Sequence, residues 1–233
     1  MLKISNLKSG YGGSEVLHGI ELVADNGVTA IIGPNGCGKS TLLKSIFNLC
    51  DISSGKIMFK DKDITKLPSF ELIREGISYV PQGRQVFSDL TVKENLEMGA
   101  FSFNDKELVK RNLADVFNKF PMLKQKQNDY AFTLSGGQQQ LLALARALIQ
   151  DPEMLLLDEP SLGLSPKAMN EVFEKIREIN KEGVGIVIVE QNAKKAVGMA
   201  DKTFVLESGR IALQGDKSIM KNKKLREVYF GGE

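Results

Sequence analysis

The stretch Gly33-Pro34-Asn35-Gly36-Cys37-Gly38-Lys39-Ser40-Thr41 decides the fold of this chain. It fits the pattern G-x-x-x-x-G-K-[ST], which is typical of a phosphate-binding P-loop. The apolar run at residues 28–32 predicts a buried strand before it, and apolar residues at helical spacing over residues 42–49 predict a helix after it. A strand that turns sharply into a helix is the context that this motif requires.

The chemistry of this loop follows from its residue types. Its glycines allow backbone conformations that bring the main chain close to a ligand. Backbone N–H groups from Gly36 to Thr41, together with the positive end of the helix dipole, are expected to point at phosphate oxygens. We expect residues 33–41 to bind nucleotide, with Lys39 on the β- and γ-phosphates, Ser40 on Mg²⁺ and Thr41 at the α-phosphate. The alternative is a glycine-rich turn that fits the pattern by chance.

The composition is that of a soluble globular protein. The chain has 233 residues, with 42% hydrophobic and 26% charged residues and a formal net charge of +2. This charge gives no strong attraction to nucleic acid or anionic lipid. No apolar run approaches the roughly 18 residues of a membrane span, and the first residues lack the apolar region of a signal peptide. We therefore expect a cytoplasmic chain whose membrane role, if any, depends on a partner.

The two cysteines, Cys37 and Cys50, form neither a disulfide framework nor a metal-ligand cluster. Cys37 lies inside the phosphate loop, where positive potential would favour its thiolate. The alternative interpretation is an inert residue that fills the loop.

Alternating strand and helix patterns predict an α/β fold with a mainly parallel sheet. An antiparallel β region is expected in residues 1–32, with Asn26-Gly27 as a hairpin signal, and a second hairpin is expected at Ser208-Gly209. Residues 84–133 are interpreted as a helical subdomain inserted into a nucleotide-binding core of residues 1–83 and 134–233, all within one domain of 1–233. Thr91 and Glu94 have the spacing of a capping box.

An acidic pair, Asp158-Glu159, follows the apolar run at residues 154–157, which predicts a strand buried on both faces. Such strands carry their last residues to the edge where α/β sheets bind ligands. We expect Asp158 to bind Mg²⁺ and Glu159 to deprotonate the attacking water. Gln82 also ends a predicted strand, so its amide is expected to reach Mg²⁺ or the same water. The alternatives are two solvated carboxylates and an ordinary turn glutamine.

A second bare helix N-terminus is predicted at Leu134-Ser135-Gly136-Gly137-Gln138. It would bind phosphate as the P-loop does. Two phosphate-binding helix ends with one P-loop suggest that nucleotide is held between two chains. Tyr11, which lies between glycines, would offer a face to adenine, although an exposed loop tyrosine is the commoner case.

With these motifs the whole chain resembles the ATP-binding-cassette (ABC) ATPases. Residues 33–41 match Walker A, Gln82 the Q-loop, residues 134–138 the signature motif, residues 154–159 Walker B, and Ser161-Leu162-Gly163-Leu164 the D-loop. Within that family the chain is most similar to the ATPase subunits of branched-chain amino acid importers. This finer resemblance is carried by residues 80–87, 90–96 and 189–193, and by Tyr229-Phe230-Gly231-Gly232.

The resemblance implies the remaining expectations. Two cassettes, identical or sister chains, would close over two ATP molecules, with Ser135, Gly136, Gly137 and Gln138 of one chain completing the site of the other. Transmembrane permease subunits would hold the chain at the cytoplasmic face of the membrane, and a solute-binding protein would act indirectly. A permease helix would dock near residues 84–87, although Phe87 could instead pack inside the helical subdomain.

One departure from the family pattern concerns the switch histidine. The only histidine is His18, and Gln191 occupies the switch position, as in the branched-chain amino acid subgroup. A glutamine amide donates hydrogen bonds but cannot take up a proton from water. This favours Glu159 as the base and Gln191 as a positioning residue.

The sequence leaves three alternatives to amino acid import. One is a soluble ABC ATPase that acts on nucleic acid or ribosomes, and it lacks the expected long insertion, second cassette or basic stripe with aromatics. Another is the ATPase of a different ABC transporter, for urea or amide import or for lipid export. The last is a non-catalytic ATP switch, which the intact Lys39, Asp158 and Glu159 argue against.

Overall fold

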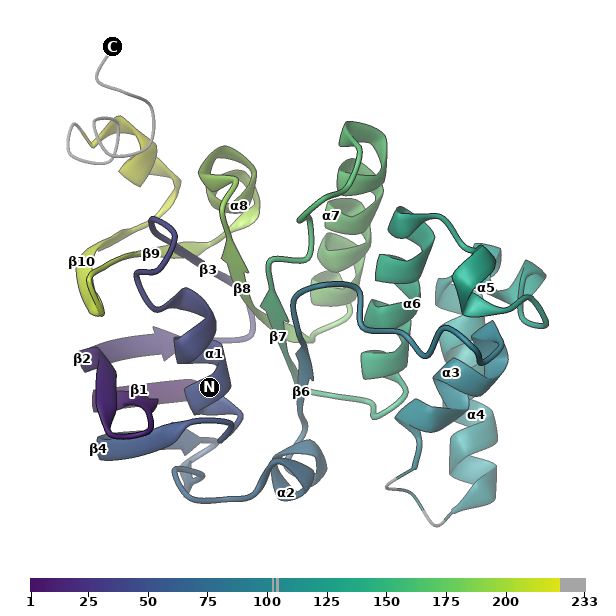
Figure 1. Ribbon diagram of the computed structural model, residues 1–233, viewed down its shortest axis with the longest axis horizontal. Coiled ribbons are helices and arrows are strands. Elements are labelled where there is room, and N and C mark those ends of the chain that lie inside the picture. Colours follow the sequence, from purple (N-terminus) through teal and green to yellow (C-terminus); the bar gives the residue numbers. More distant parts are fainter. Residues whose placement is uncertain (102, 104, 223–233) are drawn as a thin grey trace.

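Two β-sheets of different kinds form the framework of the protein (Figure 1). The computed structural model describes residues 1–101, 103 and 105–222. The first sheet is antiparallel, with strand order β2-β1-β4-β5. Its strands are β1 (Leu2–Tyr11), β2 (Ser14–Ala24), β4 (Asp51–Phe59) and β5 (Lys62–Asp63).

The second sheet has the order β10-β9-β3-β8-β7-β6. Strands β9, β3, β8, β7 and β6 pair in parallel, and β10 pairs antiparallel with β9. The bounds are β3 (Val28–Ile32), β6 (Ile77–Val80), β7 (Met154–Asp158), β8 (Gly185–Glu190), β9 (Lys202–Glu207) and β10 (Arg210–Gly215). Every residue of β3, β7 and β8 is buried, as expected for parallel strands covered on both faces. The predicted α/β fold, with a mainly parallel sheet and an N-terminal antiparallel region, is confirmed.

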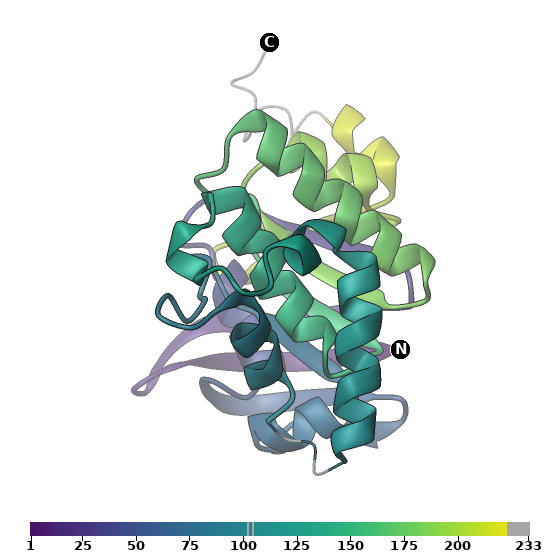
Figure 2. The same cartoon turned by 90° about the vertical axis from the view of Figure 1, so that its right-hand side faces the viewer.

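Helices cover both faces of the parallel sheet (Figures 1 and 2). On one face α1 (Lys39–Ile46) packs between the two sheets, and α2 (Ser69–Arg74) packs on β6. On the other face lie α6 (Gly136–Leu148), α7 (Pro166–Lys181) and α8 (Ala193–Met199). Alternate residues of β7 belong to two separate hydrophobic cores. Leu155 and Leu157 pack in the core that includes α6, whereas Leu156 packs in the core that includes α1.

The segment between β6 and α6 is helical, as its sequence pattern predicts. It contains α3 (Val92–Gly99), α4 (Lys106–Lys119), α5 (Pro121–Gln125) and the 3₁₀ helix η1 (Ala131–Thr133), and α3 packs on α6. The predicted capping box is confirmed, since the Thr91 hydroxyl accepts from the Glu94 N–H and the Glu94 carboxylate accepts from the Thr91 N–H. A second short 3₁₀ helix, η2 (Lys217–Lys221), follows β10.

The hairpin predicted at Asn26-Gly27 is wrong, whereas the hairpin at Ser208-Gly209 is confirmed. Strand β2 pairs with β1 in the antiparallel sheet, and β3 pairs with β8 and β9 in the other. A tight type I′ turn needs positive φ at both central residues, and neither Asn26 nor Gly27 has it. Because β3 is buried on both faces, the chain crosses here from one sheet to the other.

Two further features bear on membrane association and on the C-terminus. Within the described ranges, no helix combines the length and the apolar character that crossing a membrane requires. The stretch Tyr229–Gly232, which contributed to the family resemblance, lies outside the described residues.

The loop between β6 and α3 depends on one buried side chain, Asn95. Its Oδ1 accepts from the Phe87 N–H at 2.8 Å, and its Nδ2 donates to the carbonyls of Phe87, Leu90 and Thr91 at 2.9–3.2 Å. A fully buried amide with all its hydrogen bonds made fixes the backbone around it.

We predict that Asn95→Ala lowers the free energy of unfolding by about 2–3 kcal/mol, because it removes the hydrogen bonds of a buried amide and leaves the Phe87 N–H without a partner. Urea denaturation measures this change. The control is Lys93→Ala on the same helix, which removes an exposed ion pair with Glu97 and should change stability by about 0.5 kcal/mol or less. Equal losses in the two variants would contradict the role given to Asn95.

Candidate functional site

The P-loop connects β3 to α1 with a backbone that its glycines make possible. Gly36 and Gly38 have φ of 79° and 106°, in the left-handed region. Gly33 is required for a different reason: a Cβ there would lie 2.3 Å from the carbonyl oxygen of Leu206 and 2.5 Å from the Sγ of Cys37. The loop therefore packs directly on β9, and it opens its N–H groups at the start of α1.

Lys39 begins α1, and its ammonium group turns back over the loop. Its Nζ donates to the carbonyl oxygens of Gly33 and Pro34, each at 3.0 Å, and lies 3.9 Å from Oε1 of Glu159. Both Lys39 and Glu159 are buried. The P-loop cation and the carboxylate predicted to act as base thus face each other across the same site.

Ser40 and Asp158, which with Gln82 were the predicted metal ligands, are in direct contact. The Ser40 Oγ donates to Oδ1 of Asp158 at 2.8 Å, and Asp158 is only 2% exposed. A carboxylate beside a hydroxyl, both next to a phosphate-binding loop, is a donor set that suits Mg²⁺, which takes oxygen ligands from protein and from substrate phosphates. The residues present therefore fit the predicted metal.

Tyr79, which the sequence patterns did not single out, supports the metal-binding carboxylate from the neighbouring strand. Its hydroxyl donates to Oδ2 of Asp158 at 3.1 Å. Burial raises the pKa of Tyr79, and the negative charge of Asp158 raises it further, so the phenol keeps its proton and remains a donor. The only signal in the sequence was that Tyr79 lies in the predicted strand before Gln82.

Glu159 accepts hydrogen bonds from both glutamines that were predicted at the site. The Nε2 atoms of Gln82 and Gln191 donate to its Oε2 at 2.9 Å and 2.7 Å. Three segments far apart in the sequence, the ends of β6, β7 and β8, thereby meet at one carboxylate. Glu159 itself has a positive φ of 46°, an uncommon conformation for a non-glycine residue.

These groups line a pocket of about 290 Å³ at the carboxyl edge of the parallel sheet. Its walls bring together the loop, the acidic residue and both glutamines. The lining residues are Val16, Asn35, Gly36, Gly38, Lys39, Ser40, Thr41, Gln82, Glu159 and Gln191. Size, edge position and polar lining match what a nucleotide phosphate group requires.

Tyr11 and Cys37 are among the predicted nucleotide-binding residues that do not line this pocket. Tyr11 is 44% exposed at the end of β1, and the Lys44 ammonium lies 6.0 Å from its ring centroid. Stacking of Tyr11 on adenine therefore stays a prediction. Cys37 is buried against Gly33, and burial raises the pKa of its thiol, which favours the interpretation of an inert packing residue.

The second predicted phosphate site, at the start of α6, also lies outside this pocket. Ser135 is the N-cap of α6 and forms a capping box with Gln138, so both side chains serve the helix end. Gly137 is needed for packing, because a Cβ there would lie 2.6 Å from the Cβ of Ala168 on α7. The side chain of Arg84 lies against Gly136, where an added Cβ would be 2.1 Å from Nη1.

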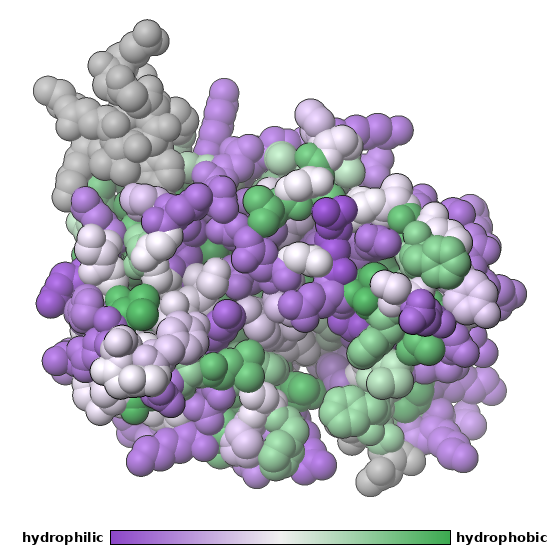
Figure 3. Space-filling view, in the orientation of Figure 1, coloured by the Kyte–Doolittle hydropathy of each residue, from purple (hydrophilic) through white to green (hydrophobic). Residues whose placement is uncertain are grey.

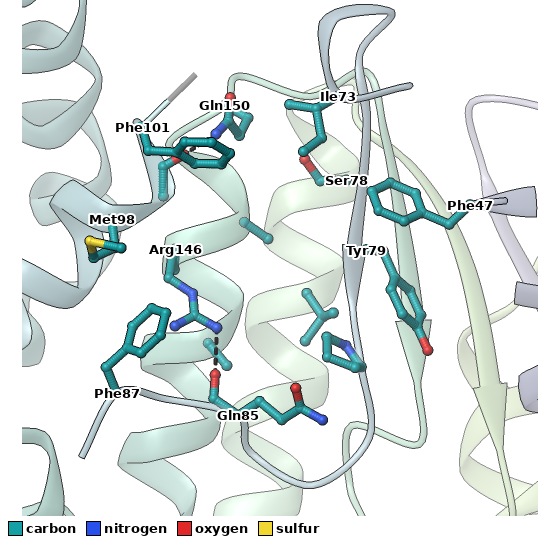
Figure 4. A pocket seen from close by; sticks show the side chains of 15 residues that line it. Phe47, Ile73, Ser78, Tyr79, Gln85, Phe87, Met98, Phe101, Arg146 and Gln150 are labelled. Atoms are coloured by element: carbon teal, nitrogen blue, oxygen red, sulfur yellow. Dashed lines mark hydrogen bonds between the residues drawn. The ribbon is translucent and has the colours of Figure 1, made fainter. Parts of the chain in front are cut away.

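A separate groove of about 390 Å³ lies between β6 and α3. Figure 3 shows hydrophobic side chains on both sides of a hollow at this place. In Figure 4, Phe87, Met98 and Phe101 stand on one side, Phe47, Ile73 and Tyr79 stand on the other, and Arg146 lies between them.

The charged centre of this groove is Arg146. Its guanidinium lies 4.9 Å from the ring centroid of Phe87 and donates from Nη2 to the carbonyl oxygen of Gln85. Burial lowers the pKa of Arg146. Phe87 is 46% exposed, so it forms a wall of the groove rather than packing inside the helical segment.

Comparisons with known proteins agree with this geometry. The family model described as "ABC transporter" matches residues 18–162. The high-affinity branched-chain amino acid transport ATP-binding protein BraG of Pseudomonas aeruginosa is 42% identical over 234 residues, which span 100% of both chains.

Two solved structures have the same fold. The crystal structure of the ADP conformation of MJ1267, an ATP-binding cassette of an ABC transporter, has a TM-score of 0.89 and 29% identity, and the match covers 99% of this chain and 98% of that one. The dimeric structure of a post-hydrolysis state of the cassette MJ0796, bound to ADP and Pi, has a TM-score of 0.80 and 25% identity, over 93% and 99% of the two chains.

We predict that Tyr79→Phe raises the Mg²⁺ concentration for half-maximal phosphate release from ATP by about tenfold, because a supporting hydrogen bond to a metal ligand is lost. Titration of Mg²⁺ at saturating ATP measures this shift. Tyr130→Phe, an exposed tyrosine stacked on Phe132, is the matched control and should leave the titration unchanged. A coincident titration for Tyr79→Phe and the wild type would show that the phenol does not support the metal site.

Proposed function

The chain belongs to the ABC transporter family, and on that premise we propose that it powers an importer of branched-chain or related amino acids. As a member of this family it is an ATP-binding subunit and an ATPase. The observation that carries the finer proposal is the 42% identity with BraG over the full length of both chains. Gln191 at the switch position, a feature of the branched-chain amino acid subgroup, supports the same assignment.

In the proposed reaction, Glu159 is the general base. Its carboxylate lies at the end of β7 beside Lys39, and a base placed there would take the proton of a water that attacks the γ-phosphorus. Gln82 and Gln191 each donate to this carboxylate and so hold its orientation. Neither amide can take up or release a proton in the reaction, so the role proposed for both glutamines is positioning.

Binding of ATP would replace hydrogen bonds within the P-loop by hydrogen bonds to phosphate oxygens. The Lys39 Nζ donates to two loop carbonyls, and β- and γ-phosphate oxygens would compete for the same donor. The N–H groups at the start of α1 would hold the remaining phosphate oxygens. Ser40 and Asp158 would hold Mg²⁺, which, when bound, would neutralise charge on the phosphates.

We predict that Glu159→Gln lowers kcat for ATP hydrolysis by about 10²- to 10⁴-fold, the range for loss of a general base. Gln191→Ala should lower kcat by only about tenfold, the effect of one transition-state hydrogen bond worth about 1.4 kcal/mol. Steady-state phosphate release measures both values, and ATP binding to each variant serves as the control. Equal losses in the two variants would refute this division of roles.

The complete site is proposed to need two cassettes. Ser135, Gly136 and Gly137 lie outside the pocket that contains Lys39 and Glu159, although they form a helix N-terminus, an end that attracts phosphate. A second chain, identical or a sister subunit, would place its own α6 N-terminus over the bound ATP. The structure of MJ0796, which is dimeric and bound to ADP and Pi, supports the pairing of two cassettes.

The membrane connection is proposed to run through the groove around Arg146. Its apolar walls, formed by the core on one side and the proposed subdomain of residues 84–133 on the other, suit a short amphipathic helix of a permease subunit. Docking there would hold the chain at the cytoplasmic face of the membrane. A solute-binding protein would deliver the amino acid to the permease, and nucleic acid has no part in this proposal.

We predict that Phe87→Asp abolishes copurification of the chain with its permease subunits, and with it ATP-driven uptake of radiolabelled leucine into proteoliposomes, because a charge in the apolar groove opposes docking. The matched variant Phe87→Tyr keeps the ring and should retain both activities. Uptake by the intact complex of a solute unlike leucine, isoleucine and valine, with none of these three transported, would contradict the proposed substrate class.

A further inference from the structure

A buried carboxylate beside the proposed catalytic site has no role in the mechanism described so far. Glu190 is the last residue of β8 and is only 2% exposed. Among the described residues, no cationic side chain forms an ion pair with it. A buried carboxylate without a cation is costly for stability, and an apolar residue of similar size would be favoured in a strand whose only task is packing.

The carboxylate of Glu190 accepts one hydrogen bond from the backbone N–H of Asn192 and two from Ser161, the first residue of the D-loop. Its Oε1 accepts from the backbone N–H of Ser161 at 3.0 Å, and its Oε2 accepts from the Ser161 hydroxyl at 2.9 Å. Ser161 is buried, whereas the next residue, Leu162, is 45% exposed. One carboxylate therefore fixes the base of a loop whose tip is at the surface.

The same short segment carries the proposed general base. Glu159 has a left-handed backbone, with φ of 46°, and such a conformation persists only where its surroundings hold it. Its N–H donates to the carbonyl of Val189 at 2.9 Å, and its side chain accepts from Gln191 at 2.7 Å. With the two Glu190 bonds, residues 159–161 are tied to residues 189–191 on both sides of Pro160.

We propose that Glu190 is a positioning residue for ATP hydrolysis: by holding Ser161 it fixes the backbone of Glu159 and the base of the D-loop. The inference rests on the proposed function, in which Glu159 is the general base. Glu190 touches neither nucleotide nor water in this scheme. It acts through Ser161, and its loss would displace the Glu159 carboxylate from the attacking water.

Burial raises the pKa of Glu190, and the nearby Glu159 carboxylate raises it further. A neutral group of the same shape is therefore a fair substitute at this position. A glutamine there could accept from the Ser161 N–H with its oxygen and donate to the Ser161 hydroxyl with its nitrogen. Substitution by glutamine and by alanine thus separates the hydrogen bonds from the mere presence of a side chain.

The test compares Glu190→Ala with Glu190→Gln in the purified chain together with the subunits that copurify with it. Glu190→Ala should lower kcat for ATP hydrolysis by about 100-fold, the scale of a displacement of about 1 Å at a reacting group, with KM and the Kd for a fluorescent ATP analogue changed less than about twofold. Glu190→Gln should retain kcat within about threefold, because both bonds to Ser161 are reproduced.

Three results would overturn the proposal. They are a kcat for Glu190→Ala equal to that of the wild type, a Glu190→Gln variant as inactive as Glu190→Ala, or a parallel loss of nucleotide affinity. If Glu190→Ala does not fold, Ser161→Ala decides instead. It removes one of the two bonds and should lower kcat by about tenfold at unchanged KM, whereas unchanged kcat would refute the role.

Glu159→Gln in the same assay distinguishes the two levels of failure. If it hydrolyses ATP as fast as the wild type, the proposed base is wrong whatever Glu190 does. If it is inactive while Glu190→Ala is fully active, only the positioning role fails.

Discussion

Parallel pairing of β3 with β8, and of β8 with β7, is the constraint on which the site depends. In this register Ile32 lies beside Glu190, and Asp158 lies beside Val189. The residues that follow each strand therefore leave the sheet at the same edge. Because these strands are buried on both faces, a slip in register would expose apolar residues or bury polar ones, so the geometry of the site is fixed by the packing of the sheet.

Much of this arrangement could be predicted from sequence because its determinants are local. The P-loop is predicted from its glycines and from the strand and helix patterns on either side of it. Asp158-Glu159 is predicted from the apolar run before it. The capping box at Thr91 also follows from residues three positions apart. In each case the chemistry and the conformation are set within one short segment.

The contacts that hold the site together could not be predicted in the same way, because they join distant segments. Tyr79 on β6 donates a hydrogen bond to Asp158 on the neighbouring strand β7. Glu190 accepts one from Ser161, which is 29 positions away in the sequence. Neither pair has a local signature. Asn26-Gly27 failed for the opposite reason: its dipeptide signal is local and strong, but the burial of β3 on both faces decides where the chain goes.

The groove and the pocket are joined by one short stretch of chain, and this has a mechanical consequence. From β6 onward, Tyr79 contacts Asp158, Gln82 contacts Glu159, Gln85 contacts Arg146, and Phe87 forms the groove wall. Asn95 fixes the far end of this stretch by bonding both backbone groups of Phe87. A partner that displaces Phe87 would therefore strain the backbone that leads to Gln82, unless the hydrogen bonds between Asn95 and Phe87 break. Since the Gln82 amide donates to the Glu159 carboxylate, docking at the groove, as proposed, would be coupled to the orientation of the proposed base through the short segment from Gln82 to Phe87.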